Sequence, residues 1–339
     1  MALIATLLTA CDEPEANSEW ELEFRAPVVS QVLMEAHVLP DSVWSPQYAI
    51  HHDGKIFVSD RQAPWVWVLS GEGEFLTVIG DQPGEGPGEL MRPRVLRPGG
   101  EGTFWVYDSG QRRVNHLTWD GSYLESFLFP LGAFAPLQNR RVLLPPAPGS
   151  YDPLLIWEGR DVGTAPVGLG PGRPGSMSPM DALLPWAWHM STGTQDSVTI
   201  LHVGQGRMWR IQTEGEEWSV NELPLPGPVV QLAQDAAERR RGSMDIPRGN
   251  QIVVSLFEDL QHGPDGRAWV TTSLTEMLGM WLEPDDRRAT VVLTSPAREF
   301  AELRSIIPMG PDTLIAVYEQ EVRRLIMGPA GAPDWAMRP

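Results

Sequence analysis

The chain has 339 residues, of which 42% are hydrophobic and 21% charged, so it holds enough apolar material for a folded core. Lys and Arg number 26 against 44 Asp and Glu, which gives a net charge of −18. Such a charge argues against nucleic acid as a partner and against binding to anionic lipid by charge alone. The 33 glycines and 32 prolines are too many for long helices and favour short strands joined by turns.

The first ten residues are uncharged and have the length of the apolar part of a secretion signal. As a helix they would span about 15 Å, roughly half of a bilayer core, which excludes an ordinary transmembrane helix. They are followed by Cys11, the only cysteine of the chain. A disulfide within the chain and a four-cysteine zinc site are therefore both excluded.

The stretch Leu8-Thr9-Ala10-Cys11 resembles the lipobox of bacterial lipoproteins. This resemblance implies that residues 1–10 are a signal peptide and that the mature chain begins at Cys11, whose thiol is lipidated. The alternative is that Cys11 is a buried thiol in an ordinary N-terminal segment. Residues 11–19 are acidic and lack a large apolar side chain, so we expect them to form a flexible, solvated tether.

A unit of turns and short apolar runs recurs through the rest of the chain. The first copy has an Asp-Gly turn and a run at 53–60, then runs at 66–69 and 73–80. The second begins at 101 and repeats this pattern as far as 124. Asp-Gly between alternating hydrophobic residues predicts a hairpin, because glycine accepts a positive φ without steric cost. Further copies lie at 141–157, 196–211, 265–282 and 312–326.

The turns of successive copies are about 38 to 69 residues apart. A period of ~40–50 residues built from four strands is typical of a propeller. We therefore predict an all-β fold, a six-bladed β-propeller of four-stranded antiparallel blades, over residues 20–328, with a tail at 329–339. The strand around Val28–Leu33 is predicted to complete the sixth blade and close the ring.

Two further features fit this architecture. Five of the 14 tryptophans fall on predicted strands, and we expect them to be wedged between blades rather than to stack on a ligand. They are Trp67, Trp105, Trp157, Trp209 and Trp281. Residues 229–241 break the pattern with apolar residues at helical spacing and three terminal arginines, which predicts a short helical insertion on one face of the ring.

Two segments, the link between the first and second units and a run within the second unit, resemble a known family. The glycine-rich link from Gly80 to Leu90, and the run from Asp108 to Val114, are similar to motifs of the bacterial six-bladed β-propeller lipoproteins related to NHL repeats. The resemblance covers residues 20–328 and implies a lipid-anchored propeller of the cell envelope. From the residues alone, the link is a rigid turn between an outer strand and the next inner strand. A phosphate-binding loop is the competing interpretation, but no Lys-Ser/Thr pair follows it.

The chemistry of the chain is less informative. Histidines and arginines lie near the predicted inner strands without metal-ligand spacing: His51, His52, Arg92, Arg94, Arg97, His189, His202 and His262. We select His52, Arg92, Arg94 and His202 as candidates for binding at the mouth of the channel. Ser191 is expected in a loop without a nucleophile elbow. No catalytic residue, metal ligand or cofactor is predicted, and calcium, which needs several converging oxygen ligands, is the cation left open.

Two functional hypotheses follow. The first is a lipid-anchored, extracytoplasmic, non-catalytic module that binds a protein, a peptide or a component of the bacterial cell envelope, attached to the membrane through its lipid only. The alternative is a metal-dependent lactonase or lyase with its site in the central channel. Fold alone does not choose between them, because six-bladed propellers host both binding modules and enzymes.

Overall fold

The computed structural model describes most of the predicted propeller. The described residues are 20–35, 44–80, 82–100, 102–130, 132–145, 154–169, 188–193, 197–202, 207–214, 217–223, 225–231, 234–235, 257–272, 277–283, 288–293 and 303–331. The predicted signal peptide, Cys11 and the tether at 11–19 lie outside them. Among these residues there is no helix of the length and apolarity that a bilayer crossing requires.

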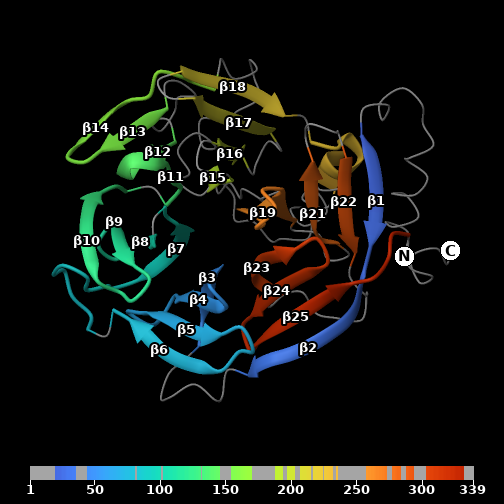
Figure 1. Ribbon diagram of the computed structural model, residues 1–339, viewed down its shortest axis with the longest axis horizontal. Helices are drawn as coiled ribbons and strands as arrows, with labels where there is room; N and C mark the ends of the chain where they lie inside the picture. Colours follow the sequence, from blue (N-terminus) through green and yellow to red (C-terminus); the bar gives the residue numbers. More distant parts are fainter. Residues whose placement is uncertain are drawn as a thin grey trace, which may run out of the picture.

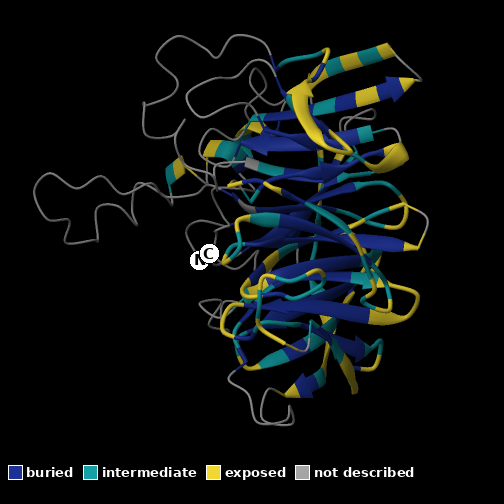
Figure 2. Cartoon of the chain, turned by 90° about the vertical axis from the view of Figure 1, so that its left-hand side faces the viewer, coloured by how far each residue is buried: buried dark blue, intermediate teal, exposed yellow. Residues whose placement is uncertain are grey.

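Six antiparallel sheets are arranged around a central axis, with the innermost strand of each sheet next to that axis (Figure 1). The prediction of an all-β, six-bladed propeller with four antiparallel strands per blade is therefore confirmed. Each sheet buries both faces by packing against its neighbours in the ring. In the side view, buried residues fill the strand interiors, and exposed residues gather at turns and outer strands (Figure 2).

Blades 1 and 2 are the most regular. The Asp-Gly turn of blade 1 has positive φ at both Asp53 (46°) and Gly54 (70°), as a tight hairpin requires. The strands of blade 1 are β3 (Pro46–His52), β4 (Lys55–Asp60), β5 (Val66–Ser70) and β6 (Phe75–Ile79). Those of blade 2 are β7 (Pro93–Pro98), β8 (Thr103–Asp108), β9 (Arg113–Thr118) and β10 (Tyr123–Leu128). The glycine-rich link joins β6 to β7, as predicted.

Blades 3 and 4 have shorter inner strands. Blade 3 consists of β11 (Ala135–Pro136), β12 (Arg141–Leu144), β13 (Leu155–Glu158) and β14 (Asp161–Thr164), with a 3-10 turn η2 (Gln138–Arg140) before β12. Blade 4 consists of β15 (Trp188–Thr192), β16 (Ser197–His202), β17 (Arg207–Glu214) and β18 (Glu217–Leu223). β11 contributes only two residues, and both pair with residues of β12. Proline there removes a backbone donor, which limits the length of this strand.

Blades 5 and 6 contain the ring closure. Blade 5 consists of β19 (Phe257–His262), β20 (Ala268–Thr272), β21 (Met277–Glu283) and β22 (Arg288–Leu293). Blade 6 consists of β23 (Leu303–Gly310), β24 (Thr313–Tyr318), β25 (Glu321–Met327) and, from the other end of the chain, β2 (Pro27–Glu35). The predicted closure by residues 28–33 is therefore confirmed, since β2 pairs antiparallel with β25.

One strand was not predicted from the sequence. β1 (Glu21–Arg25) pairs parallel with β22 and adds a fifth strand to blade 5. The N-terminal segment therefore covers the outer edge of one blade and completes the next. Covering that edge removes a row of unpaired backbone groups from the rim.

The predicted helical insertion begins two residues earlier than expected. Residues 227–231 and 234–235 are helical, and the remainder of the predicted segment 229–241 lies outside the described residues. Val229 is fully buried in a cluster with apolar residues of blades 4 and 5, such as Met208 and Leu260. This packing fixes the helix where the chain passes from blade 4 to blade 5.

The predicted role of the tryptophans is also confirmed. All five are at most 2% exposed, and Trp269 on β20 is buried as well. Trp105 of blade 2 and Trp157 of blade 3 make an edge-to-face contact with ring centroids 5.8 Å apart, which joins the two blades. Burying about 200 Å² of such a side chain contributes about 5 kcal/mol of transfer free energy before entropy is counted.

Candidate functional site

The inner strands share a local irregularity that places polar side chains in the channel. In β3, β7, β19 and β23 the register with the next strand shifts between the first and third residues. A bulge of this kind redirects the side chain that follows it. The residues after the shift are Tyr48, Val95, Asp259 and Ser305.

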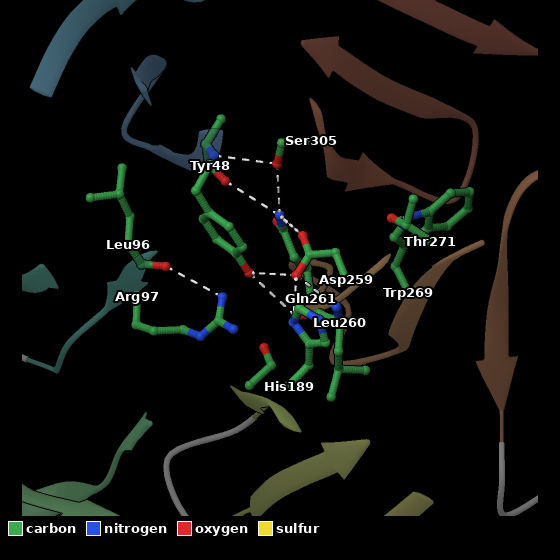
Figure 3. Close-up of polar contacts among 12 residues, drawn as sticks. Tyr48, Leu96, Arg97, His189, Asp259, Leu260, Gln261, Trp269, Thr271 and Ser305 are labelled. Atoms are coloured by element: carbon green, nitrogen blue, oxygen red, sulfur yellow. Dashed lines mark hydrogen bonds and ion pairs between the residues drawn. The ribbon is translucent and has the colours of Figure 1, made fainter. Parts of the chain in front are cut away.

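Three of these four residues belong to one group of polar side chains, which we call the channel cluster. Its members come from the inner strands of five blades (Figure 3): Tyr48, Arg97, His189, Asp259, Gln261 and Ser305. The sequence alone did not single out Tyr48, Asp259, Gln261 or Ser305. The signal that was available is a polar residue at the third position of the inner strand, which recurs in β3, β19 and β23.

Asp259 is the acidic centre of the channel cluster. Its Oδ1 accepts hydrogen bonds from the Tyr48 hydroxyl (2.9 Å) and the Leu260 backbone N–H (2.7 Å). Its Oδ2 accepts one from Gln261 Nε2 (2.9 Å). His189 Nδ1 lies 3.6 Å from Oδ1. The carboxylate is only 4% exposed, so these donors replace the water that it loses.

Ser305 connects the cluster to the backbone of blade 1. Its Oγ accepts hydrogen bonds from the Ala49 backbone N–H and from Gln261 Nε2, both at 3.3 Å. Gln261 Nε2 also lies 3.4 Å from the Ala49 carbonyl oxygen. Blades 1, 5 and 6 are therefore joined around the axis by polar contacts as well as by apolar packing.

Arg97 is the cationic member of the cluster and has few partners. The residue is 3% exposed, and its guanidinium lies 4.7 Å from the centroid of the Tyr48 ring. It donates one hydrogen bond, to the adjacent Leu96 carbonyl at 3.4 Å, while its buried Nε has no partner among the described residues. Burial lowers the pKa of Arg97 to about 10, with Asp259 opposing this in part, so the group remains charged at neutral pH.

Two channel histidines are held neutral. Burial lowers the pKa of His189 to about 4, although Asp259 opposes the shift and Arg97 adds to it. Burial also lowers the pKa of His262 to about 3, helped by Arg210 and Arg97 and opposed by Asp265. At neutral pH both imidazole rings are therefore uncharged, and Arg97 carries the positive charge of the channel cluster.

His262 makes a second polar group beside the cluster. Its Nδ1 lies 3.0 Å from Ser191 Oγ, and its Nε2 lies 3.1 Å from Thr199 Oγ1. Ser191 is on strand β15, which corrects its expected position in a loop. A serine beside a histidine is the first part of a nucleophile site. Here both ring nitrogens are engaged by hydroxyl groups, so within the described residues no carboxylate is left to orient the ring.

A hollow of about 730 Å³ is lined by residues of blades 1 to 4. His52 and Pro98 are the last residues of β3 and β7, and Thr192 is the last residue of β15. All three line the hollow, so it lies on the face where each inner strand turns into the next strand, which we call the inner-turn face. The other lining residues include Gly100, Trp105, His116, Trp119, Asn139 and Arg140.

Aromatic rings form the wall of this hollow. His52 stacks on Trp119 with centroids 4.0 Å apart and planes 5° from parallel. His116 stacks on Trp105 at 3.8 Å, and its Nδ1 lies 3.2 Å from Glu125 Oε1. Asn139 and Arg140 have positive φ (57° and 61°), an uncommon conformation that directs the η2 turn toward the rim.

The four predicted channel-mouth residues do not lie together. His52 is exposed in the wall of the hollow. Arg92 and Arg94 are exposed at the opposite end of β7 from Pro98, and the Arg92 backbone N–H donates to the Asp108 carboxylate. His202, fully buried, pairs with Trp188 at the far end of β15 from Thr192. The structure thus places His52 on the inner-turn face and the other three toward the opposite face.

Acidic, histidine and cysteine side chains are the groups that most often hold metal ions in proteins. Within the part of the chain that the structure describes, no three of them converge closely enough to hold an ion. Asp259 and His189 are a pair rather than a triad.

Comparisons with known proteins support the fold. No protein-family model matches the chain, and no curated protein matches it in sequence. Among solved structures, a streptogramin B lyase is similar with a TM-score of 0.53 at 14% identity, over 88% of this chain and 98% of that chain. Virginiamycin B lyase from Staphylococcus aureus has a TM-score of 0.51 at 12% identity, over 88% and 99% of the two chains. The calcium-binding protein regucalcin from Agrobacterium tumefaciens has a TM-score of 0.50 at 8% identity, over 90% and 95%. At these identities the likeness is one of propeller architecture.

Proposed function

We propose that the protein is a non-catalytic binding module, anchored by lipid on the extracytoplasmic side of a bacterial envelope. Its ligand is a protein, a peptide or an envelope component, and the hollow on the inner-turn face receives it. The observation that carries the proposal is this hollow of about 730 Å³, built by turns of four different blades. Binding sites are commonly concave and assembled from loops on a rigid scaffold.

The anchor is supported by the sequence of the N-terminal segment. The apolar run, the lipobox-like stretch ending in Cys11 and the acidic tether follow one another in the order of a lipoprotein leader. The resemblance of the 80–90 and 108–114 segments to NHL-like lipoproteins supports the same address. Replacing Cys11 by Ser should abolish incorporation of labelled palmitate and release the protein from the membrane fraction. Unchanged labelling in that variant would overturn the anchor.

The binding role is tested by filling the hollow. Gly100 lines it, and a side chain added at Gly100 would meet no atom within 4 Å, so Gly100→Trp should fold and occupy the hollow. Gly310 has equally open surroundings and is not among the residues lining the hollow, which makes Gly310→Trp the matched control. Capture of partners from solubilised envelope should be lost with Gly100→Trp and kept with Gly310→Trp. Equal capture by both variants would contradict the proposal.

A metal-dependent lactonase or lyase is the second candidate. The observation that favours it is the pairing of Asp259 with His189 in the channel, two groups of the kinds that bind metal ions. Metal analysis of the purified full chain distinguishes the two functions. Stoichiometric calcium or zinc, removed together with a measured turnover, would overturn the binding module in favour of the enzyme.

A further inference from the structure

The position of Arg97 in the ring shows that the fold does not require a charge there. In the four inner strands with the same bulge, the fifth residue pairs with the corresponding residue of the second strand. The residues at this position are Ile50, Arg97, Gln261 and Ile307. Both isoleucines are 3% exposed, as Arg97 is. Blades 1 and 6 thus fill the same place with an apolar side chain.

Arg97 is also incompletely bonded. A guanidinium has five N–H donors, and the described residues supply one acceptor to Arg97, at 3.4 Å. Its Nε is buried without a partner. The nearby carboxylate of Asp259 is occupied by Tyr48, Leu260 and Gln261 and forms no ion pair with Arg97. Unsatisfied buried donors are costly to a fold, and charged ones are the most costly.

A guanidinium in this state suits a planar anion with two oxygens. Carboxylates meet both nitrogens of an arginine fork at once, and this geometry is specific to them and to phosphates. The charge in the channel distinguishes the two. His189 and His262 are neutral at neutral pH, so Arg97 offers one positive charge, and Asp259 is already present beside it. A carboxylate adds one negative charge to this buried place, whereas a phosphate dianion adds two and leaves the larger excess of negative charge there.

We propose that Arg97 binds a carboxylate group of the ligand inside the channel, with the Tyr48 ring supporting the guanidinium. This inference rests on the proposed binding function and names the chemical class of the ligand. Arg97 directly precedes Pro98, which lines the hollow on the inner-turn face. His189 keeps 22% of its side chain exposed, which shows that solvent reaches the cluster.

The test measures anion binding by the purified full chain through its melting temperature. Acetate and propionate are titrated against chloride at constant ionic strength, with acetamide as the neutral match and inorganic phosphate as the dianion. Wild-type protein should be stabilised by the carboxylates and not by acetamide, with phosphate at least about tenfold weaker. Arg97→Ile, which copies Ile50 and Ile307, should lose the effect, and Arg97→Lys should weaken it about tenfold because lysine lacks the fork.

Each other result decides against the inference. Equal stabilisation of wild type and Arg97→Ile by acetate, or phosphate as effective as acetate, would overturn it. So would the absence of any carboxylate effect up to about 0.1 M. If Arg97→Ile does not fold, Arg97→Lys and the comparison of acetate with acetamide on the wild type still decide. These outcomes are independent of the capture experiment. If Gly100→Trp abolishes partner capture but no carboxylate stabilises the protein, this inference is wrong and the proposed binding function stands.

The source of the carboxylate is distinguished by a second titration. Trialanine with a free C-terminus is compared with its C-terminal amide and with acetate. If trialanine with a free C-terminus binds more tightly than both its amide and acetate, the source is a peptide C-terminus. Equal binding of acetate and the free peptide indicates a small organic acid or a side-chain carboxylate.

Discussion

Charged side chains are buried at the ends of β4 and β8 in blades 1 and 2, and also in the channel. The two regions differ in how many hydrogen bonds the chain supplies to these charges. Asp60 and Asp108, fully buried at the ends of β4 and β8, each accept hydrogen bonds from four N–H donors. For Asp108 the donors are the backbone amides of Met91, Arg92, Gly110 and Gln111. Arg97, also buried, has one acceptor for its five donors among the described residues. A charge that the fold depends on is saturated by the chain, whereas the charge of Arg97 is left open.

The largest effect is expected where the saturated charge is removed. Asp108→Ala leaves four amides of the loop and the glycine-rich link without an acceptor and should lower the free energy of unfolding by about 4 kcal/mol. Urea unfolding measures it. Ser109→Ala, at the exposed neighbouring position, is the control and should change stability by less than about 1 kcal/mol. A loss of similar size in both variants would contradict the distinction.

An intermediate effect is expected from pH, through the channel histidines. The folded pKa values of His189 and His262, about 4 and about 3, lie below the ordinary histidine value of 6.5. The unfolded chain therefore takes up protons that the folded chain does not as the pH falls below 6.5, so stability is full above that pH and is lost toward pH 4. We expect each of these residues to account for about 2 kcal/mol between pH 7.5 and pH 5. The double variant His189→Gln/His262→Gln should remove this part of the slope, and an unchanged slope would show that the channel is not desolvated.

A smaller effect is expected when the acidic centre of the channel loses one of its donors. Tyr48→Phe removes the hydroxyl that donates to Asp259 but keeps the ring that lies against Arg97. The remaining donors still satisfy the carboxylate, so the loss should be about 1 kcal/mol. Thermal unfolding measures it. A loss as large as that of Asp108→Ala would mean that the channel cluster is as structural as the loop carboxylates.

The smallest effect is expected at Arg97 itself. In the absence of ligand, Arg97→Ile should change the free energy of unfolding by no more than about 1 kcal/mol in either direction, because replacing a poorly satisfied buried charge by an apolar side chain is often neutral. The contact with the Tyr48 ring, worth about 0.5–1 kcal/mol, is what the variant loses. If urea unfolding shows that Arg97→Ile lowers the free energy of unfolding by several kcal/mol, Arg97 stabilises the fold as Asp108 does, and the contrast between the two charges is wrong.

Local signals were sufficient to predict the second and third strands of the blades, and the fourth strands of blades 1, 2 and 6. Asp53-Gly54 specifies a tight turn, and the largely apolar runs on either side specify strands, of which β4 is buried along almost its whole length. β1 was missed because Glu21–Arg25 is short and largely polar, and because its parallel pairing with β22 joins residues more than 260 apart. No local pattern reports such a pairing.

The candidate site was harder to predict for the same reason. His52 was identified because it precedes a clear turn, and it does line the hollow. Arg92 and Arg94 were identified by the same criterion, but the direction of β7 puts them at the other end of the strand from Pro98. Tyr48 and Asp259 are 211 residues apart in the chain and meet only because the ring closes. Arg97 was noted as lying near an inner strand, but its missing partners are visible only in three dimensions.

The two N-terminal strands also determine how the molecule carries a mechanical load. A pull on residue 20 along the strand direction acts on β1 parallel to its whole length, so its hydrogen bonds to β22 are sheared together rather than opened one after another. Beyond β1 the same pull is transmitted through β2 to β25. A propeller held from its N-terminal side therefore resists tension at the seam between its fifth and sixth blades, and rupture under force should begin at that seam.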